Sequence, residues 1–437
     1  MSDQRSSPGC SPLAGRGADD GRQGLGLTGA NQGTRTGQTG GEADMGDRTI
    51  RGKTAIVGLG ETRYYKRGAS PEPEFKMTLE AIRLAADDAG IDVREIDGFA
   101  SFSNDRNDPA HIAAALGSRQ VSFSNMFWGG GGGGGSGAVA NAAAAVAAGY
   151  CEIAVAYRGL AQGQFGRFGQ GSTARVVAGP TAFTAPYGLM SPAQTFAMRV
   201  RRYMHDHGIE QAALRAVALA SYHHAQTNPR AVMHGRPLTA EDYDNSRWIV
   251  EPFHLFDCCQ ENDGAAAVIV TSSERARDMR HPPAYILGAA QGSDYRQAAT
   301  VHNAPDYGTS NFKTLAPRLY AMAGVGPKDV DALQSYENFT GGVMMSIVEH
   351  GFCEPDEVNE FFTLENFRAD GGVLPLNTSG GNLAECYMHG LELITEAVRL
   401  IRGTSPCKVE RQVNVSMVTS GPMVQPVSSL ILGREAN

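Results

Sequence analysis

The sequence predicts an α/β protein with a largely parallel sheet, built from two similar halves. Three observations predict this fold class. Short apolar strands alternate with helices from residue 54 onward, which is the usual order in α/β proteins. The second half repeats the order of the first, which indicates two related domains with a site between them. With 437 residues, the chain is also long enough for two domains of ordinary size.

Residues 1–48 differ in composition from the rest of the chain. They are rich in Gly, Ser, Asp and Arg, and they contain no aromatic residue, no Ile and no Val. Such a segment cannot bury enough apolar surface to offset its ordering entropy, so we expect a disordered tail without a catalytic role. Met45 stands just before the first predicted strand, and residues 1–44 are therefore a candidate artefact of start-codon choice.

The first half opens with an apolar run at 54–60 that glycines close, which is typical of a buried strand. Apolar residues at helical spacing follow over 79–89, and a glycine ends this helix. A second strand is expected near 96–99. Residues 136–148 are nearly all Ala and Val, which predicts a helix buried on every side. A buried strand is expected at 151–157.

The stretch from about 160 to 245 breaks this alternation. It opens with a Gly-rich loop and then carries two predicted helices, near 193–207 and 210–226. We interpret it as an insertion over the catalytic face, where loops determine substrate specificity. Strand character returns at 264–271.

Short sequence matches relate the two halves. Ala89-Gly90-Ile91 and Ile96-Asp97 match Ala323-Gly324-Val325 and Val330-Asp331 with the same spacing. Each pair stands after a predicted helix and before a predicted strand. Two copies of a βαβ-type unit predict two domains related by a pseudo-twofold axis.

The later part of the unit also recurs. The glycine run, the Ala-rich helix and the strand after it resemble 379–381, a helix at 390–402 and a strand at 412–418. We therefore expect an N-terminal half at 49–275 and a C-terminal half at 276–437. The alternative is a chance similarity between two ordinary α/β segments.

Composition and motif spacing exclude several classes of function. The formal net charge of −8 argues against nucleic-acid binding. The seven cysteines show no C-x-x-C spacing and the eleven histidines no H-E-x-x-H pattern, so we expect no metal and no separate cofactor. Scattered cysteines indicate reduced thiols in a cytoplasmic protein. No apolar run reaches the ~20 residues of a transmembrane helix, and no signal peptide is predicted.

The glycine run from Gly129 to Gly135 precedes Ser136 and the Ala-rich helix. It satisfies the dinucleotide-binding pattern trivially, and it lacks the Gly-Lys-Ser/Thr ending of a P-loop. Backbone N–H groups without side chains at a buried helix start are suited to an anion or a developing oxyanion. The alternative is a flexible linker.

The order of motifs resembles the thiolase superfamily. Segments 244–253 (Asp-Asn-Ser-Arg-Trp-Ile-Val-Glu-Pro-Phe) and 263–267 (Asp-Gly-Ala-Ala-Ala) resemble its sterol-carrier-protein-type branch, and Asn-Thr-Ser-Gly-Gly at 377–381 fits the same family. The resemblance covers about residues 52–435. It implies a thiolase fold, in which two repeated halves pack as a five-layer αβαβα sandwich.

The resemblance fails at every residue that handles thiolate chemistry. The position of the thiolase nucleophile falls on Gly132, and the loop that carries the second thiolase cysteine has Gly421 and no Cys. The two positions that carry histidines in thiolases hold Tyr336 and Tyr387. Claisen condensation in this fold needs a thiolate to carry the acyl group, and glycine cannot supply one. Tyrosine, with an ordinary pKa near 10, can act as a general acid or base.

This pattern resembles the thiolase-like aldolases of the lipid-transfer-protein group, which act in bacterial steroid side-chain degradation. Their reaction cleaves a β-hydroxyacyl-CoA to a ketone and a shorter acyl-CoA, so CoA enters as part of the substrate. The resemblance implies a partner with an OB-fold of the DUF35 family, and a homodimer that a heterotetramer could extend. The lack of obvious basic clusters for CoA also suggests that another subunit helps to bind it.

The expected mechanism transfers one proton and needs neither a Schiff base nor a metal. Tyr336 or Tyr387 takes the proton of the β-hydroxyl group, the Cα–Cβ bond breaks, and the other tyrosine protonates the α-carbon. Backbone N–H groups near Gly132 and Gly421 stabilise the enolate oxygen. His389 is a further candidate for substrate binding, with a structural role as the alternative.

Two other functions stay open at this point. A divergent acyltransferase would need a thiolate from Cys386 or Cys353. A catalytically inactive subunit would bind acyl-CoA or lipid and serve as a scaffold for a partner. Arg199, Arg201 and Arg202 could face CoA phosphates, with a solvated helix face as the alternative.

Overall fold

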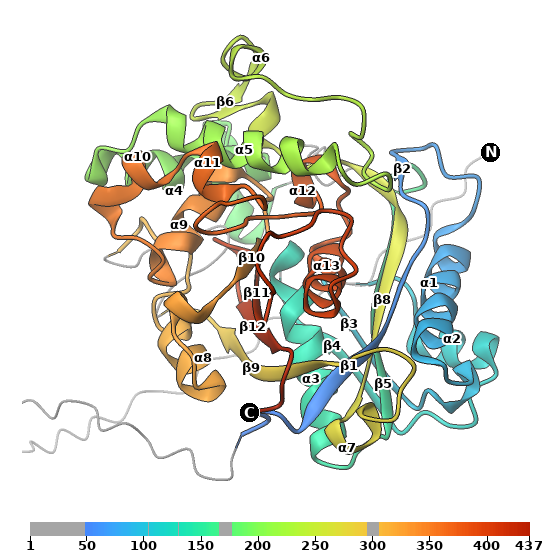
Figure 1. Ribbon diagram of the computed structural model, residues 1–437. Helices are drawn as coiled ribbons and strands as arrows, with labels where there is room; N and C mark the ends of the chain where they lie inside the picture. Colours follow the sequence, from blue (N-terminus) through green and yellow to red (C-terminus); the bar gives the residue numbers. More distant parts are fainter. Residues whose placement is uncertain (1–48, 104, 130, 166–176, 295–305) are drawn as a thin grey trace, which may run out of the picture. The chain divides into compact units, whose positions relative to one another are not determined.

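A ten-stranded mixed sheet is the framework of the protein (Figure 1). The prediction of a largely parallel sheet was wrong, because most of its strand pairs are antiparallel. The computed structural model describes residues 49–103, 105–129, 131–165, 177–294 and 306–437. In spatial order the strands are β4 (Phe123–Phe127), β3 (Gly98–Phe102), β5 (Ile153–Ala161), β8 (Asn262–Ser272), β1 (Thr54–Glu61), β9 (Ala284–Gly292), β12 (Val427–Gly433), β11 (Val415–Ser420) and β10 (Ala332–Ser335). The short β2 (Tyr65–Lys66) pairs with β8, and β6 (Trp248–Val250) pairs with β7 (Phe253–His254) in a separate small sheet.

The two halves of the sheet have the same topology, which confirms the predicted repeat. In the first half β3 and β5 are parallel, and β8 and β1 follow antiparallel. In the second half β10 and β11 are parallel, and β12 and β9 follow antiparallel. The two halves also join, because β1 pairs with β9 at Ala55–Tyr285 and Ile56–Ala284. The two β layers that the resemblance implies are therefore joined into one sheet where β1 pairs with β9.

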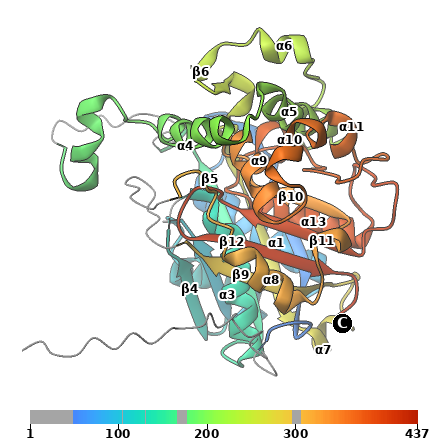
Figure 2. The ribbon, with the colours of Figure 1, turned by 90° about the vertical axis from the view of Figure 1, so that its left-hand side faces the viewer.

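Helices cover both faces of each half-sheet, which gives the five layers expected from the thiolase fold (Figures 1 and 2). The inner layer consists of α3 (Gly135–Ala147) and α13 (Leu391–Arg402), and each contacts strands of both halves. Outside, α1 (Glu74–Ala89) covers β1, β5 and β8, and α8 (Leu315–Ala323) covers β9 and β12. The inner helices therefore place residues of one half against the other.

The internal repeat extends to single hydrogen bonds. The carboxylate of Asp97 accepts the backbone N–H groups where β5 begins, with distances of 3.1 and 3.0 Å. Asp331 accepts the N–H groups where β11 begins, at 2.8 and 3.0 Å. Gly90 and Gly324 end α1 and α8 in the left-handed conformation that favours glycine. The same local chemistry therefore ends the same elements in both halves.

The insertion carries the two helices expected from its sequence, α4 (Pro192–His207) and α5 (Gln211–Ala225). Figure 2 shows α4, α5 and α6 at one end of the sheets. The remaining helices are α2 (Pro109–Leu116), α6 (Ala240–Asp244), α7 (Ser273–Ala276), α9 (Thr340–Glu349), α10 (Val358–Phe361), α11 (Leu364–Phe367) and α12 (Gly381–Ala384). Because α5 packs on α9 and α12, the insertion covers the segments that follow β10.

Some predictions concern residues that the structure does not describe. The predicted tail at 1–48 lies outside the described residues, as does most of the Gly-rich loop of the insertion. The predicted boundary at 275 falls in α7, between β8 and β9, and the domain limits stay predictions. Within the described residues, no helix combines the length and the apolar character that a membrane crossing needs.

Candidate active site

Two buried phenols from separate elements meet next to the inner helices. Tyr336 directly follows β10, and Tyr387 lies in the loop between α12 and α13. The hydroxyl of Tyr336 donates to the hydroxyl of Tyr387 at 2.7 Å, and the two side chains are almost inaccessible to solvent. Backbone hydrogen bonds to Thr419 and Asn262 hold the two residues in place. The structure thus brings together the two tyrosines that replace the thiolase histidines.

Burial dominates the acidity of this pair. It raises the pKa of Tyr336 well above the ordinary value, and the neighbouring Tyr387 raises it further. Burial also raises the pKa of Tyr387 well above the ordinary value, although the hydrogen bond from Tyr336 and the charge of Arg158 act in the opposite direction. Both phenols are therefore neutral at neutral pH. Such a pair is suited to pass a proton along its hydrogen bond and poorly suited to hold a free phenolate.

Gly132 lies against the ring of Tyr336. A Cβ atom at this position would lie 1.9 Å from Cζ of Tyr336 and 2.3 Å from its hydroxyl oxygen. No real Cβ comes so close to another heavy atom, so a side chain at 132 and the phenol at 336 exclude each other. The absence of a side chain at position 132 therefore leaves the space that the ring of Tyr336 occupies.

Gly421 lies against the glycine run at Gly133, the residue after Gly132. A Cβ at Gly421 would lie 2.2 Å from Cα of Gly133, and its φ of +67° also favours glycine. Two of the first N–H groups of α3 are already used, because Ser136 and Gly137 donate to the hydroxyls of Ser420 and Ser428 at 3.1 and 2.9 Å. An oxyanion would therefore need N–H groups earlier in the run, near Gly132.

His389 lies beside Tyr387. The two rings meet edge to face, with centroids 5.0 Å apart, and His389 is buried with a φ of +53°. Burial lowers the pKa of His389 well below its ordinary value, and the charges of Arg158 and Arg106 lower it further. The imidazole is therefore neutral. Of the five predicted site residues, two are the phenols themselves, Gly132 and His389 lie next to them, and Gly421 lies beside the glycine run.

One segment at the site was not predicted from the sequence. Cys258 forms an isolated antiparallel bridge with Phe339, and the N–H of Cys259 donates to the carbonyl oxygen of Asn338 at 3.1 Å. A charge on Cys259 would raise the pKa of both phenols. The sequence does not reveal this long-range pairing, so Cys259 could not be predicted at the site.

None of the cysteines that the structure describes is an activated nucleophile. Burial raises the pKa of Cys151, Cys258, Cys353 and Cys407 to about 12, and it raises the pKa of Cys259 and Cys386 well above the ordinary value. Cys386 and Cys353, the two residues that an acyltransferase would need, belong to this group. A neutral, buried thiol is a poor nucleophile, so this geometry disfavours acyl transfer.

Arg199 and Arg202 of α4 have different surroundings. Arg199 is buried and donates to the backbone carbonyl groups of Thr309 and Met423 at 3.1 and 3.3 Å, so it is structural. The interpretation of a solvated helix face is therefore wrong for this residue. Arg202 is exposed and pairs with Asp206 at 2.6 Å, as a solvated face predicts.

Two cavities lie along the insertion and the residues packed against it. One of about 580 Å³ is lined by apolar side chains of α5 and its neighbours together with Arg236 and Arg247. The other, of about 750 Å³, lies between α4 and the segment around Phe183 and Tyr187. Among the residues that the structure describes, no three His, Cys, Asp or Glu side chains could share a metal ion. The expected absence of a metal stays a prediction.

Comparisons with known proteins agree with this geometry. Residues 293–434 match the family model of the thiolase C-terminal domain-like family. The chain is 42% identical over 394 residues to a steroid side-chain-cleaving aldolase of Thermomonospora curvata, covering 88% of this chain and 99% of that protein. It is 39% identical over 392 residues to a 17-hydroxy-3-oxo-4-pregnene-20-carboxyl-CoA lyase of Mycobacterium tuberculosis, covering 88% of this chain and 100% of that protein.

Solved structures give the same fold. The Ltp2-ChsH2(DUF35) aldolase matches with a TM-score of 0.81 and 41% identity, covering 88% of this chain and 98% of the other. Human mitochondrial 3-ketoacyl-CoA thiolase matches with a TM-score of 0.62 at 13% identity, covering 88% and 99% of the two chains, which supports the fold alone.

Proposed function

The chain belongs to the family of steroid side-chain-cleaving aldolases with a thiolase fold, and from this premise we propose that it cleaves a β-hydroxyacyl-CoA by proton transfer through Tyr336 and Tyr387. The products are a ketone and a shorter acyl-CoA. One observation carries the proposal. The two phenols share a buried hydrogen bond at the positions of the thiolase histidines, and Gly132 leaves the room that the ring of Tyr336 needs.

The reaction can be written as a relay along this hydrogen bond. The β-hydroxyl proton passes to the oxygen of Tyr336, while the proton of Tyr336 moves to Tyr387. The β-oxygen becomes the ketone oxygen, and the electrons of the Cα–Cβ bond move to the thioester as an enolate. Tyr387 already carries its own proton and gives it to the α-carbon as it accepts the proton of Tyr336, so each phenol ends with one proton and the proton lost by the alcohol is balanced. The relay direction follows the donor direction from Tyr336 to Tyr387, and the raised pKa of both phenols favours concerted transfer.

The enolate oxygen needs donors that are already in place. Backbone N–H groups of the glycine run near Gly132 are candidates, because this run lies directly against Tyr336. Each such donor contributes roughly 3–4 kcal/mol to transition-state stabilisation in other enzymes. The neutral His389 beside Tyr387 is a second candidate for contact with the substrate.

A product analysis tests this function. Purified protein is incubated with two β-hydroxyacyl-CoA thioesters that carry a tertiary alcohol. Cleavage of the first releases a steroid ketone, and cleavage of the second releases a small ketone. We expect equal amounts of ketone and shorter acyl-CoA, with the steroid thioester cleaved faster. Acyl transfer from a β-ketoacyl-CoA to free CoA, without cleavage of the alcohols, would support the acyltransferase instead.

We further propose that the active form contains a DUF35-type subunit. The support is the likeness to the Ltp2-ChsH2(DUF35) aldolase over 98% of that chain. Co-expression with the DUF35 protein encoded nearest to this chain is expected to give a co-purifying complex with at least about tenfold higher kcat/KM, because a second subunit would share the binding of CoA. Equal activity of the isolated chain at the same protein concentration would contradict this prediction.

The exposed edge of the sheet supports a homodimer. The edge strand β4 leaves Met126 41% exposed, and Trp128 directly after it is 79% exposed. Long, apolar strand edges tend to pair with another chain, and twofold symmetry is the commonest arrangement. We expect Trp128→Lys to convert a dimer to a monomer in light scattering after size exclusion. Val373→Lys, at an exposed apolar position of the other half, should leave the dimer intact. A monomeric wild-type protein, or an unchanged dimer of the Trp128 variant, would contradict the proposal.

A further inference from the structure

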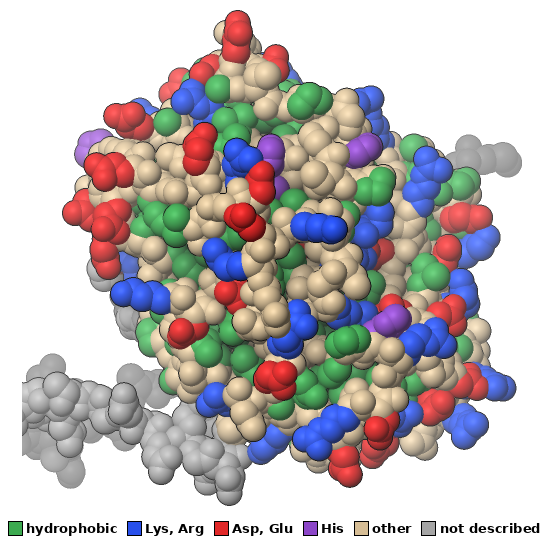
Figure 3. Space-filling model, viewed as in Figure 1, with side chains coloured by type: hydrophobic (Ala, Val, Ile, Leu, Met, Phe, Trp, Pro, Cys, Tyr) green, Lys and Arg blue, Asp and Glu red, His purple; other side chains and the backbone are tan. Residues whose placement is uncertain are grey.

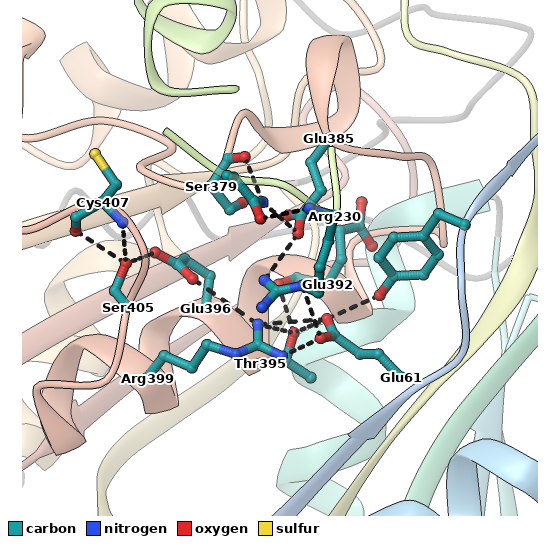
Figure 4. Close-up of polar contacts among 12 residues, drawn as sticks. Glu61, Arg230, Ser379, Glu385, Glu392, Thr395, Glu396, Arg399, Ser405 and Cys407 are labelled. Atoms are coloured by element: carbon teal, nitrogen blue, oxygen red, sulfur yellow. Dashed lines mark hydrogen bonds and ion pairs between the residues drawn. The ribbon is translucent and has the colours of Figure 1, made fainter. Parts of the chain in front are cut away.

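A cluster of charged side chains lies around Glu61 (Figure 4), and all of them except that of Arg230 are buried. It consists of four carboxyl groups and two guanidinium groups, from Glu61, Glu385, Glu392, Glu396, Arg230 and Arg399. The two arginines are shared among three of the carboxyl groups, with Glu61 bound by both. Glu392 is the exception, because no ion pair links it to any residue that the structure describes.

Glu392 is inaccessible to solvent in the first turn of α13. One of its carboxyl oxygens accepts a hydrogen bond from the side-chain amide of Asn382, and the other has no partner among the described residues. An unpaired buried carboxylate is costly, and the group avoids this cost by keeping its proton. Burial accordingly raises the pKa of Glu392 well above the ordinary value, and Glu385 and Glu337 raise it further.

Asn382 connects Glu392 to the residue after Tyr336. The backbone N–H of Asn382 donates to the carboxylate of Glu337 at 2.9 Å, and the N–H of Glu337 donates to the side-chain oxygen of Asn382 at 3.0 Å. A brace of three residues, Glu337, Asn382 and Glu392, is thus closed by hydrogen bonds. Glu337 directly follows one phenol, and the other phenol lies in the loop that Asn382 and Glu392 bound.

We propose that Glu392, held as an uncharged carboxylic acid, is a positioning residue that fixes the distance between the two phenols through Asn382 and Glu337. This proposal rests on the proposed function of the phenol pair. The acid contacts neither substrate nor reacting atoms. It holds the loop of Tyr387 against the segment of Tyr336, so that the 2.7 Å hydrogen bond is formed before the substrate binds.

The absence of charge on Glu392 is part of the proposal. An ionised Glu392 would raise the pKa of both phenols and oppose proton transfer. The titratable groups that act on Glu392, or on which it acts, come from several elements and are Tyr64, Glu337, Tyr336, Glu385, Cys386 and Tyr387. No cation among the described residues pairs with Glu392, so the carboxyl group of Glu392 is neutral when it keeps its proton.

Three variants test the brace. Glu392→Gln keeps the shape and the acceptor for Asn382, and we expect kcat within about threefold of the wild type. Glu392→Leu removes the acceptor, and we expect kcat to fall about 100-fold with little change in KM, as for a misplacement of about 1 Å. Glu396→Leu, one turn further along α13, is the control for the loss of a buried carboxyl group.

Two outcomes would overturn the proposal. Equal kcat values for Glu392→Leu and Glu396→Leu would remove the positioning role. A loss with Glu392→Gln as large as with Glu392→Leu would show that the negative charge is needed. Phenylalanine variants of Tyr336 and Tyr387, measured in parallel, separate these failures from a failure of the proposed function.

Stability provides a second test that does not depend on activity or on Glu392→Leu folding. Because the folded-state pKa of Glu392 is raised, its stabilising effect is complete below the unfolded pKa of about 4.3 and is lost as the pH rises toward the folded value. The melting temperature of the wild type should therefore fall relative to Glu392→Gln as the pH rises above the unfolded pKa of about 4.3. Parallel curves for the two proteins would contradict an uncharged Glu392.

Discussion

Replacing Tyr336 or Tyr387 by phenylalanine is expected to lower kcat by about 100-fold to 10,000-fold, the range seen when a general acid or base is lost. Either change breaks the hydrogen bond that joins the two hydroxyl groups. Without it, the proton of the substrate alcohol has no path to the α-carbon. The measurement is steady-state cleavage of a β-hydroxyacyl-CoA by each variant, with the ketone quantified by mass spectrometry.

A third tyrosine provides the control for this experiment. Tyr157 is also buried, and its hydroxyl donates to the carbonyl group of Asn107 at 2.9 Å. Tyr157→Phe removes one hydrogen bond at a cost of about 0.5–1.5 kcal/mol in stability, and it should leave kcat unchanged. Wild-type rates in both phenol variants would leave the protein as a scaffold, the non-catalytic alternative.

Gly132→Ala is expected to have the second largest effect. Its Cβ would overlap the ring of Tyr336, which must then turn away from Tyr387. We expect kcat to fall at least about 100-fold, because the proton path depends on the position of the hydroxyl group. Gly132→Cys restores the residue type of the thiolase nucleophile, and it should lose cleavage without gaining acyl transfer, since Tyr336 occupies the space of the thiol.

Gly326→Ala is a suitable control for steric effects of a methyl group, because its nearest neighbour would be 3.8 Å away. It should retain the wild-type kcat. If Gly132→Ala retained wild-type activity in a folded protein, Tyr336 would not need its present position. Acyl-transfer activity in Gly132→Cys would show that the change from thiolase to lyase is reversible by one residue.

Much of the fold could be predicted because local periodicity determines it. The Ala-rich helix was predicted at 136–148 and is found at Gly135–Ala147, but the prediction that it is buried on every side was wrong, because Ala144 and Ala147 are exposed. The repeat was visible because the helix ends and the aspartates that bind the next strand recur at the same spacing, as Asp97 and Asp331 show. Local chemistry of this kind leaves a clear record in the sequence.

The site was only partly predictable. Tyr336 and Tyr387 were selected because they fall on two known motifs, but no local pattern shows that their hydroxyl groups touch. Cys259 could not be predicted at the site, because its position depends on the pairing of distant segments. The interpretation of Arg199 as solvated failed for the same reason, since its partners come from far along the chain.

The brace around Glu392 shows what a single sequence conceals. A glutamate in the first turn of a helix is ordinary, because its negative charge interacts favourably with the helix dipole and its side chain is usually exposed. Here the residue is buried, and it binds an asparagine that also binds the segment after the other phenol. Only the packing of α13 between the two half-sheets places these groups together.

The most direct test of the account is the mass of the intact protein during turnover. The protein is mixed with a β-hydroxyacyl-CoA, quenched in acid within the first turnovers and analysed by mass spectrometry beside the products. A proton relay through the two phenols predicts an unmodified protein while ketone and shorter acyl-CoA accumulate in equal amounts. An acyl group bound to any cysteine, formed and lost at the rate of turnover, would contradict it.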